Sequence, residues 1–152
     1  MAAIKARKGQ NMIKKTRHAT TNYRALKPFF DAVNNAGGHA HFTAPGFMDL
    51  VIENLHTIDC NNLCWYSISH YGEQNGDLMA DPDMILGVSH TGGVIVPRTF
   101  RNDYLGINQE VFITKNGKQL YSPRLLTDLD EFLWQWLKNI KEQGFTPELM
   151  EV

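Results

Sequence analysis

Four carboxylates gather in one short stretch of the sequence: Glu73, Asp77, Asp81 and Asp83. Hard cations such as Mg²⁺ and Ca²⁺ prefer oxygen ligands, but this spacing lacks the alternating ligands of an EF-hand calcium loop. The stretch also contains the turn-forming pairs Asn75-Gly76 and Asp81-Pro82, and aspartates commonly cap nearby backbone N–H groups. We therefore predict that residues 73–83 form a rigid polar loop between two strands. Partner binding and metal binding by this loop are the alternatives, and no metal site is expected.

Histidines and cysteines could form a second kind of site, because zinc binds both, and four of them lie close together: His56, Cys60, Cys64 and His70. A turn at residues 61–62 between two strands places Cys60 and Cys64 on opposite faces of the sheet. The same register pairs Glu53 with His70 across the strands. The geometry therefore argues against a zinc site and against a disulfide.

The sequence gives little support for nucleophilic catalysis. It contains no Gly-x-Ser-x-Gly elbow, and neither cysteine has a basic neighbour that would lower its pKa. Residues 92–93, a Gly-Gly pair, are expected to form a hairpin turn rather than a phosphate-binding loop. We predict no catalytic residue and no cofactor.

The charge of the chain is divided unequally along its length. Residues 1–30 carry eight basic groups and no acidic group. The other 122 residues hold the remaining seven basic groups and all 16 acidic groups, although the formal net charge is only −1. A basic segment could neutralise phosphates of a nucleic acid, or it could simply be solvated. The candidate nucleic-acid contacts are Lys5, Arg7, Lys8, Lys14, Lys15 and Arg17.

The middle of the chain has the pattern of an antiparallel meander. Apolar residues alternate with polar ones over residues 48–53, and further strands are expected at residues 63–71, 83–90, 94–96 and 107–114. Asn116-Gly117 then predicts a tight hairpin turn, because both residues tolerate a positive φ.

A helix is expected on each side of the meander. The first begins near Thr21 or, alternatively, at residues 27–28, where Pro28 would occupy its first position. The second begins at Ser122-Pro123 or at residues 127–130 and ends before Gly144. Its apolar stripe consists of Leu125, Leu126, Leu129, Phe132, Leu133, Trp136, Leu137 and Ile140.

Trp134 lies on the polar flank of the second helix, outside this stripe. Tryptophan on a surface is often an interface anchor, so Trp134 is an interface candidate. Cover by other parts of the same chain is the favoured alternative.

Length and composition restrict the classes of protein. A chain of 152 residues with two cysteines is long enough for one domain and is not a disulfide scaffold. No apolar run is long enough to span a membrane, and no secretory signal precedes the domain, so a cytoplasmic location is expected. We predict a basic flexible arm at residues 1–20. Residues 21–152 should form one α+β domain, an antiparallel meander of five to six strands packed by an N-terminal and a long C-terminal helix.

A resemblance to a known family lies in three parts of the sequence: residues 67–84 (SISHYGEQNGDLMADPDM), residues 102–112 and the helix at residues 132–144. They resemble an uncharacterised bacterial family of domains of unknown function that is carried on conjugative plasmids and other mobile elements. The similarity spans roughly residues 45–145, and NGDLMADPDM is its specific part. It departs at Asp83, where glutamate is expected, and at Gly72, where a second aromatic is common. The resemblance implies a mobile-element setting and no known reaction.

We therefore expect a non-enzymatic interaction domain that binds a protein partner, with an oligomeric state that the sequence does not define. Nucleic-acid binding through residues 1–27 is the alternative, and a metal-dependent hydrolase using the acidic loop is the second alternative. The predicted recognition surface consists of Glu73, Asn75, Asp77, Asp81, Asp83, Arg101, Asn102, Asp103 and Tyr104.

Overall fold

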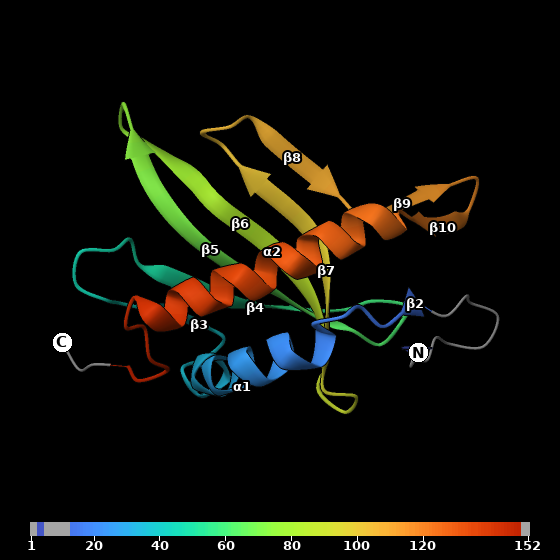
Figure 1. The fold of residues 1–152 in the computed structure, drawn as a ribbon, viewed down its shortest axis with the longest axis horizontal. Coiled ribbons are helices and arrows are strands. Elements are labelled where there is room, and N and C mark those ends of the chain that lie inside the picture. The colour runs from blue at the N-terminus through green and yellow to red at the C-terminus, as the bar shows by residue number, and fades with distance from the viewer. Residues whose placement is uncertain (1–2, 5–12, 150–152) are drawn as a thin grey trace.

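The computed structural model describes residues 3–4 and 13–149, and Figure 1 shows their arrangement. A six-stranded antiparallel sheet has the order β3-β4-β5-β6-β7-β8, and α1 and α2 pack on one of its faces, which confirms the predicted α+β meander. Two short hairpins, β1-β2 and β9-β10, form separate two-stranded sheets. The bounds are β1 (Ala3–Ile4), β2 (Ile13–Lys14), α1 (Ala19–Asn35), β3 (His39–Phe42), β4 (Leu50–Ile58), β5 (Cys64–Gln74), β6 (Asp77–Ser89), β7 (Val94–Asn102), β8 (Ile107–Glu110), β9 (Phe112–Lys115), β10 (Lys118–Tyr121) and α2 (Pro123–Glu142).

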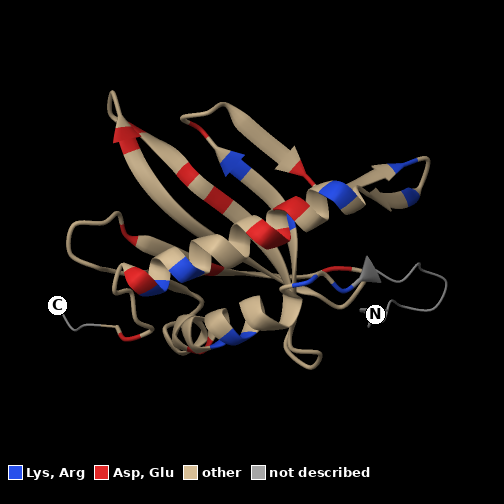
Figure 2. Cartoon of the chain, viewed as in Figure 1, with Lys and Arg blue, Asp and Glu red and all other residues tan. Residues whose placement is uncertain are grey.

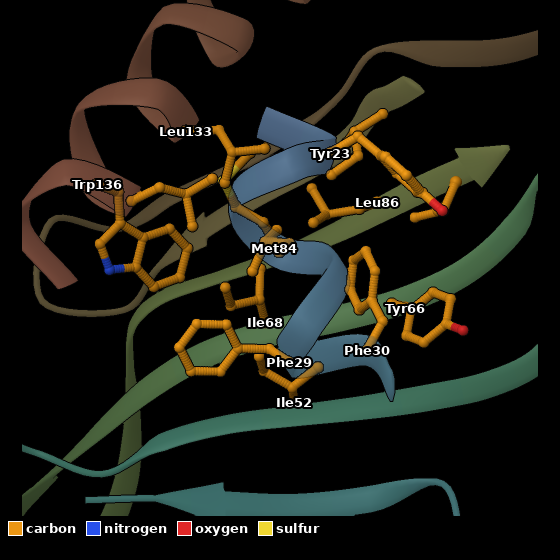
Figure 3. Close-up of a cluster of buried hydrophobic side chains, with 14 of the residues drawn as sticks. Tyr23, Phe29, Phe30, Ile52, Tyr66, Ile68, Met84, Leu86, Leu133 and Trp136 are labelled. Carbon is orange, nitrogen blue, oxygen red and sulfur yellow. The ribbon is translucent and has the colours of Figure 1, made fainter. Parts of the chain in front are cut away.

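The core lies between the sheet and the two helices. Alternate residues of the central strands, such as Ile68 on β5 and Met84 on β6, are completely buried under the helices. Phe30 of α1 packs on Tyr66 with ring centroids 4.2 Å apart, and Leu133 of α2 closes the cluster that Figure 3 shows. This burial of large apolar side chains is the main term that stabilises the fold.

The first helix begins at Ala19 and contains Pro28, so the alternative start at Pro28 is wrong. Proline removes one helical hydrogen bond, here the bond to the carbonyl of Arg24. Both Arg24 and Pro28 are exposed, so water can satisfy this carbonyl and the helix continues. Burial of Leu26 and Phe30 on the opposite side of the helix stabilises it across the proline.

The second helix begins where Ser122-Pro123 predicted, because the Ser122 hydroxyl accepts a hydrogen bond from the Leu125 N–H at 3.2 Å. The alternative start at residues 127–130 is therefore wrong. At the other end, Gly144 has a φ of +94°, as expected for a residue that ends a helix.

The register between β4 and β5 differs from the predicted one. His70 lies opposite Leu50 rather than Glu53, and Glu53 lies opposite Ser67. Two features shift the pairing: a five-residue turn that is closed by Asp59 N–H to the Leu63 carbonyl at 3.1 Å, and an irregularity between Asn54 and Ile58. His70 therefore points into the core, where its ring lies 5.5 Å from that of Trp136.

The same turn changes the position of the cysteines. The predicted turn at residues 61–62 sets Cys60 opposite Leu63 and Cys64 opposite Asp59. In the structure Cys60 lies in the turn, and Cys64 pairs with Ile58. Both cysteines are free thiols.

The strand predicted at residues 107–114 is two strands. Val111 separates β8 from β9, because its N–H donates to the Arg98 carbonyl at 2.8 Å while its own carbonyl accepts from Ser122 N–H at 3.1 Å. The chain therefore leaves the main sheet at Val111, and β9 pairs with β10 around the predicted Asn116-Gly117 turn. Residues 92–93 form the predicted turn between β6 and β7, where Gly93 N–H donates to the Ser89 carbonyl at 2.8 Å.

Candidate functional site

The acidic segment is not a loop. It is the end of a long hairpin in which only Asn75 and Gly76, with φ of +52° and +83°, form the turn. Asp81 and Asp83 lie within β6, where the pairing shifts: Ser69 lies opposite Asp83, and Tyr71 opposite Ala80. The prediction of a loop at residues 73–83 was wrong because aspartate and proline are rare in strands, and here the pairing with β5 overrides that preference.

Asp83 accepts a hydrogen bond from the Tyr71 hydroxyl and lies opposite Arg101 of β7. Burial, and then the hydrogen bond to Asp83, raises the pKa of Tyr71 to about 12. The phenol therefore stays protonated at neutral pH and acts as a donor, not as a nucleophile.

The turn between β7 and β8 is tied to β6 by several hydrogen bonds. Asp103 accepts from the Ala80 N–H at 2.7 Å through its carboxylate, and its own N–H donates to the Ala80 carbonyl at 2.9 Å. The Asn102 side-chain amide donates to Asp81 at 3.2 Å, and its carbonyl oxygen accepts from Leu105 N–H at 3.2 Å. These contacts fix residues 102–105 against the hairpin.

Gly72 allows a further contact between the two hairpins. A side chain at this position would overlap the Tyr104 hydroxyl, so only glycine lets the Tyr104 ring lie against β5. Arg101 and Asp103 form an ion pair at 3.2 Å that is partly exposed, and such pairs contribute little stability.

The structure thus brings together Asp81, Asp83 and the four predicted residues of the β7-β8 segment, Arg101, Asn102, Asp103 and Tyr104. Glu73, Asn75 and Asp77 lie farther out, at the exposed end of the β5-β6 hairpin, and Figure 2 marks the acidic positions along this hairpin in red. Among the described residues, neither Glu73 nor Asp77 has an ion-pair partner. Large apolar side chains are also exposed here: Leu78 is 74% exposed, Leu105 68% and Tyr104 45%. We call Glu73, Asp77, Leu78, Tyr104 and Leu105 the hairpin-end surface. It includes both faces of the β5-β6 hairpin, because Glu73 and Leu78 lie opposite each other on one face and Asp77 lies on the other, with Gly72 and the Tyr104 ring.

Three of the clustered carboxylates already accept hydrogen bonds from the protein, as described above for Asp81, Asp83 and Asp103. Within residues 3–4 and 13–149, no group of three or more histidine, cysteine, aspartate or glutamate side chains could hold a metal ion.

The predicted basic arm is described only in part. Lys5, Arg7 and Lys8 lie outside the described residues. Lys14 belongs to β2, and the Arg17 guanidinium is largely exposed, 3.8 Å from the Glu131 carboxylate. Residues 16 and 18 are tied to α2, because the Thr16 hydroxyl and the His18 N–H donate to the buried Asp130 carboxylate at 2.6 and 3.0 Å.

Trp134, the interface candidate, is half-buried. Its ring stacks on that of His18 with centroids 4.6 Å apart and planes 12° apart, and the Lys138 ammonium lies 4.6 Å from the Trp134 centroid. His18, just before α1, thus covers part of this ring, which leaves Lys138 and the remaining edge to solvent.

One polar cluster has no signal in the sequence. His90 lies between two tyrosines, with Nδ1 3.1 Å from the Tyr23 hydroxyl and Nε2 3.0 Å from the Tyr66 hydroxyl. Asn34 donates to Tyr66 at 3.0 Å, so Tyr66 donates to Nε2 and the ring proton is assigned to Nδ1. Burial lowers the pKa of His90 and raises that of Tyr66. Both ring nitrogens are engaged, which makes this cluster a link between α1 and the β6-β7 turn.

A second unpredicted cluster surrounds Asp59. Its carboxylate accepts from Arg98 at 2.9 Å and from the Trp65 indole at 3.1 Å, and the Arg98 guanidinium lies 4.3 Å from the Trp65 centroid. The side chains of this ion pair are only 11% and 8% exposed, so loss of either partner would leave a largely desolvated, uncompensated charge. Because the two residues are 39 positions apart, no local sequence pattern predicts the pair.

Neither helix of the described part is long and apolar enough to cross a membrane. The curated proteins and the solved structures that were compared with the chain give no match. A family model does match: it describes a domain of unknown function, DUF6908, and covers residues 21–146. This range extends the predicted similarity to include α1. Since the match covers most of the sequence, the chain belongs to the DUF6908 family of domains of unknown function.

Proposed function

We propose that this chain is a non-enzymatic interaction domain that binds a protein partner through the hairpin-end surface. The observation that carries the proposal is the exposure of Leu78, Leu105 and Tyr104 at the end of the β5-β6 hairpin and in the β7-β8 turn, which hydrogen bonds tie to β6. Exposed apolar side chains surrounded by polar ones are typical of protein-binding sites.

Rigid presentation supports this proposal. The hydrogen bonds of Asp103 and Asn102 hold the β7-β8 turn in place before any partner arrives. A preorganised surface loses less conformational entropy on binding, so more of the energy from apolar burial remains as affinity. The carboxylates of Asp81 and Asp83 then have a structural role, and Glu73 and Asp77 form the charged rim.

Charge reversal at the rim tests the proposal. We expect the Glu73→Lys/Asp77→Lys variant to lose the partner that the wild-type chain captures from its native cells, because both side chains are exposed and nothing in the fold depends on them. The control is Glu142→Lys/Glu148→Lys, which makes the same charge change at two exposed positions elsewhere.

Crosslinking identifies the contact in the captured complex. Crosslinks from the partner to residues 73–79 and 101–105 support the proposal. Equal capture by the Glu73→Lys/Asp77→Lys variant and the wild type would contradict it. Alanine at Asp81 or Asp83 is a poor test, since both side chains accept hydrogen bonds within the fold.

Nucleic-acid binding through residues 1–27 is the second candidate function. The exposure of Arg17 next to Lys14 and Lys15, in a segment without acidic residues, favours it. Affinity should fall steeply between about 50 and 200 mM salt, because each neutralised phosphate releases counterions. A deletion variant that tests the role of the basic arm should lack residues 1–12 only. Removal of Thr16 and His18 as well would break their hydrogen bonds to Asp130. Salt-independent binding would contradict this function.

We also propose that the gene for this chain belongs to a bacterial mobile genetic element, and that the protein acts in the cytoplasm. The resemblance of residues 67–84 and 102–112 supports the first of these statements. The genes on either side of the one that encodes this chain provide the test: conjugation or integration genes are expected there.

A further inference from the structure

The β9-β10 hairpin stands apart from the six-stranded sheet and projects from one end of the molecule (Figure 1). Its base is fixed, because Ser122 N–H donates to the Val111 carbonyl at 3.1 Å and the Phe112 ring lies 4.7 Å from the Arg98 guanidinium. Beyond this base, residues 113–120 are all exposed. The fold thus carries a projecting element that contributes little to its core.

The charged residues of this hairpin are all basic. Lys115 and Lys118 flank the turn, and residues 112–121 contain no acidic residue. Ile113 and Leu120 lie opposite each other across the two strands and are 51% and 45% exposed. Cross-strand neighbours share one face of a hairpin, so two lysines accompany one exposed apolar pair.

The hairpin-end surface has the complementary composition. It presents Leu78 beside Glu73 on one face of the β5-β6 hairpin, and Asp77 on the other face, where the Tyr104 ring packs against Gly72. Leu105 is exposed in the neighbouring β7-β8 turn, and the β9-β10 hairpin presents an apolar pair beside two lysines. The two elements point in different directions in Figure 2, so they do not meet within one chain. Complementary charge steers association and fixes register, while apolar contact supplies most of the affinity.

We propose that the β9-β10 hairpin of one copy of this chain docks on the hairpin-end surface of a second copy. This inference rests on the proposed function, because it names the partner of that same surface. The contact joins two different patches, so it repeats head to tail and produces a chain or a ring rather than a two-fold dimer.

A second copy explains more of the hairpin than a nucleic acid does. Phosphates would engage Lys115 and Lys118 but would leave Ile113 and Leu120 exposed to water. Each patch offers only a few exposed side chains, so association is expected to be weak and reversible. It should weaken as salt screens the charges.

Charge exchange tests the proposal in the full chain by sedimentation velocity over a range of concentrations. We expect the wild type to sediment faster as its concentration rises, and less so at about 500 mM salt than at about 50 mM salt. Lys115→Glu/Lys118→Glu and Glu73→Lys/Asp77→Lys should each be monomeric, because each sets like charges against each other. The variant that combines all four substitutions should associate again, since the opposite charges are restored with exchanged sign.

The matched control is Arg24→Glu/Lys141→Glu, which reverses two exposed basic residues outside both surfaces and should associate like the wild type. Circular dichroism checks that every variant is folded. Monomeric wild type at all concentrations would overturn the inference, as would a combined variant that stays monomeric. So would loss of duplex-DNA binding in Lys115→Glu/Lys118→Glu without any self-association, which would assign the hairpin to nucleic acid.

The two proposals fail in different ways. If the wild type is monomeric but Glu73→Lys/Asp77→Lys still loses a captured protein partner, only the head-to-tail contact is wrong. If neither self-association nor partner capture depends on Glu73 and Asp77, the hairpin-end surface itself has been assigned wrongly.

Discussion

At the scale of single residues, buried polar groups join parts of the chain that are far apart in sequence. Asp130 of α2 is only 1% exposed and accepts hydrogen bonds from Thr16 and from the His18 backbone. His18 precedes α1 without capping it through its own side chain. A carboxylate supplied by the other helix therefore fulfils the usual task of a capping residue at the positive end of α1.

Replacement of Asp130 by alanine should lower the free energy of unfolding by about 2–4 kcal/mol, because the buried His18 N–H and the partly buried Thr16 hydroxyl lose their acceptor. Asp130→Asn should cost less, since an amide oxygen can still accept one of these bonds. Urea denaturation measures the effect, with Asp128→Ala as an exposed control on the same helix. Equal stability of Asp130→Ala and Asp128→Ala would contradict the assigned role.

The His90 cluster predicts a pH dependence. Burial lowers the pKa of His90 from its ordinary 6.5, so folding favours the neutral ring. The stability that this preference provides is complete above pH 6.5 and declines as the pH falls toward the pKa in the folded state. Asp31 opposes the shift and Lys27 adds to it, but burial dominates.

The measurement is urea denaturation between about pH 7.5 and 5. His90→Gln keeps an amide that can donate and accept but does not titrate, so its stability should fall less over this range than that of the wild type. His39→Gln, at an exposed position, is the control and should retain the full pH dependence. An unchanged slope in His90→Gln would remove His90 as its source.

At the scale of elements, local patterns predicted what depends on local sequence. The apolar stripe from Leu126 to Ile140 forms one face of α2, and Asn116-Gly117 forms the turn between β9 and β10. Both were predictable because helical periodicity and a positive φ depend on residues that are close in sequence. The β4-β5 register was missed because it depends on a five-residue turn held by the Asp59 side chain, which accepts from Asn61 and Leu63 N–H.

The candidate site was predictable to the same extent. The composition of residues 73–83 and 101–104 indicates a polar site. It does not indicate that the two segments contact each other, because this contact depends on the long β5-β6 hairpin. Asp81 meets Asn102, and Ala80 meets Asp103, only because β6 continues through Pro82 to the Asn75-Gly76 turn. Long-range strand pairing decides this, and local propensity argues against it.

Gly72 tests the contact between the two hairpins. We expect Gly72→Ala to displace the Tyr104 side chain, because the added methyl group overlaps its hydroxyl. Tyr104 is partly exposed and can swing outward, so the loss of stability should stay below about 1 kcal/mol. Hydrogen exchange of the amides at residues 103–106 should become faster, and partner binding should weaken.

A double-mutant cycle separates this effect from backbone strain. Because Tyr104→Ala removes the clash, adding Gly72→Ala to it should change exchange at residues 103–106 very little. If Gly72→Ala has the same effect in the presence and absence of the Tyr104 ring, the contact between position 72 and Tyr104 is not the cause.

At the scale of the whole molecule, the core and the projecting elements are separate. Most residues that fill the core come from the six-stranded sheet and the two helices, and the β9-β10 hairpin adds only Phe112 and the partly buried Tyr121 at its base. The exposed large apolar residues include Leu78 and Leu105 on one end and Ile113 and Leu120 on another. A fold that needed these ends for stability would bury them. Their exposure at two ends of the molecule is the observation on which both proposed contacts rest.

Removal of the outer β9-β10 hairpin should leave the fold intact. Phe112 and Tyr121 lie opposite each other, so an Asn-Gly turn can join them in place of residues 113–120. The main loss is the contact of Gln119 with the Asn61 side chain at 3.4 Å, so unfolding should become easier by only about 1–2 kcal/mol. Thermal unfolding should stay cooperative, and the amides of β5 and β6 should keep their protection, because their strand pairing does not involve the hairpin. Self-association should disappear at the same time. Loss of the cooperative transition instead would show that the hairpin is part of the folding unit, and its exposed residues would then need a structural explanation.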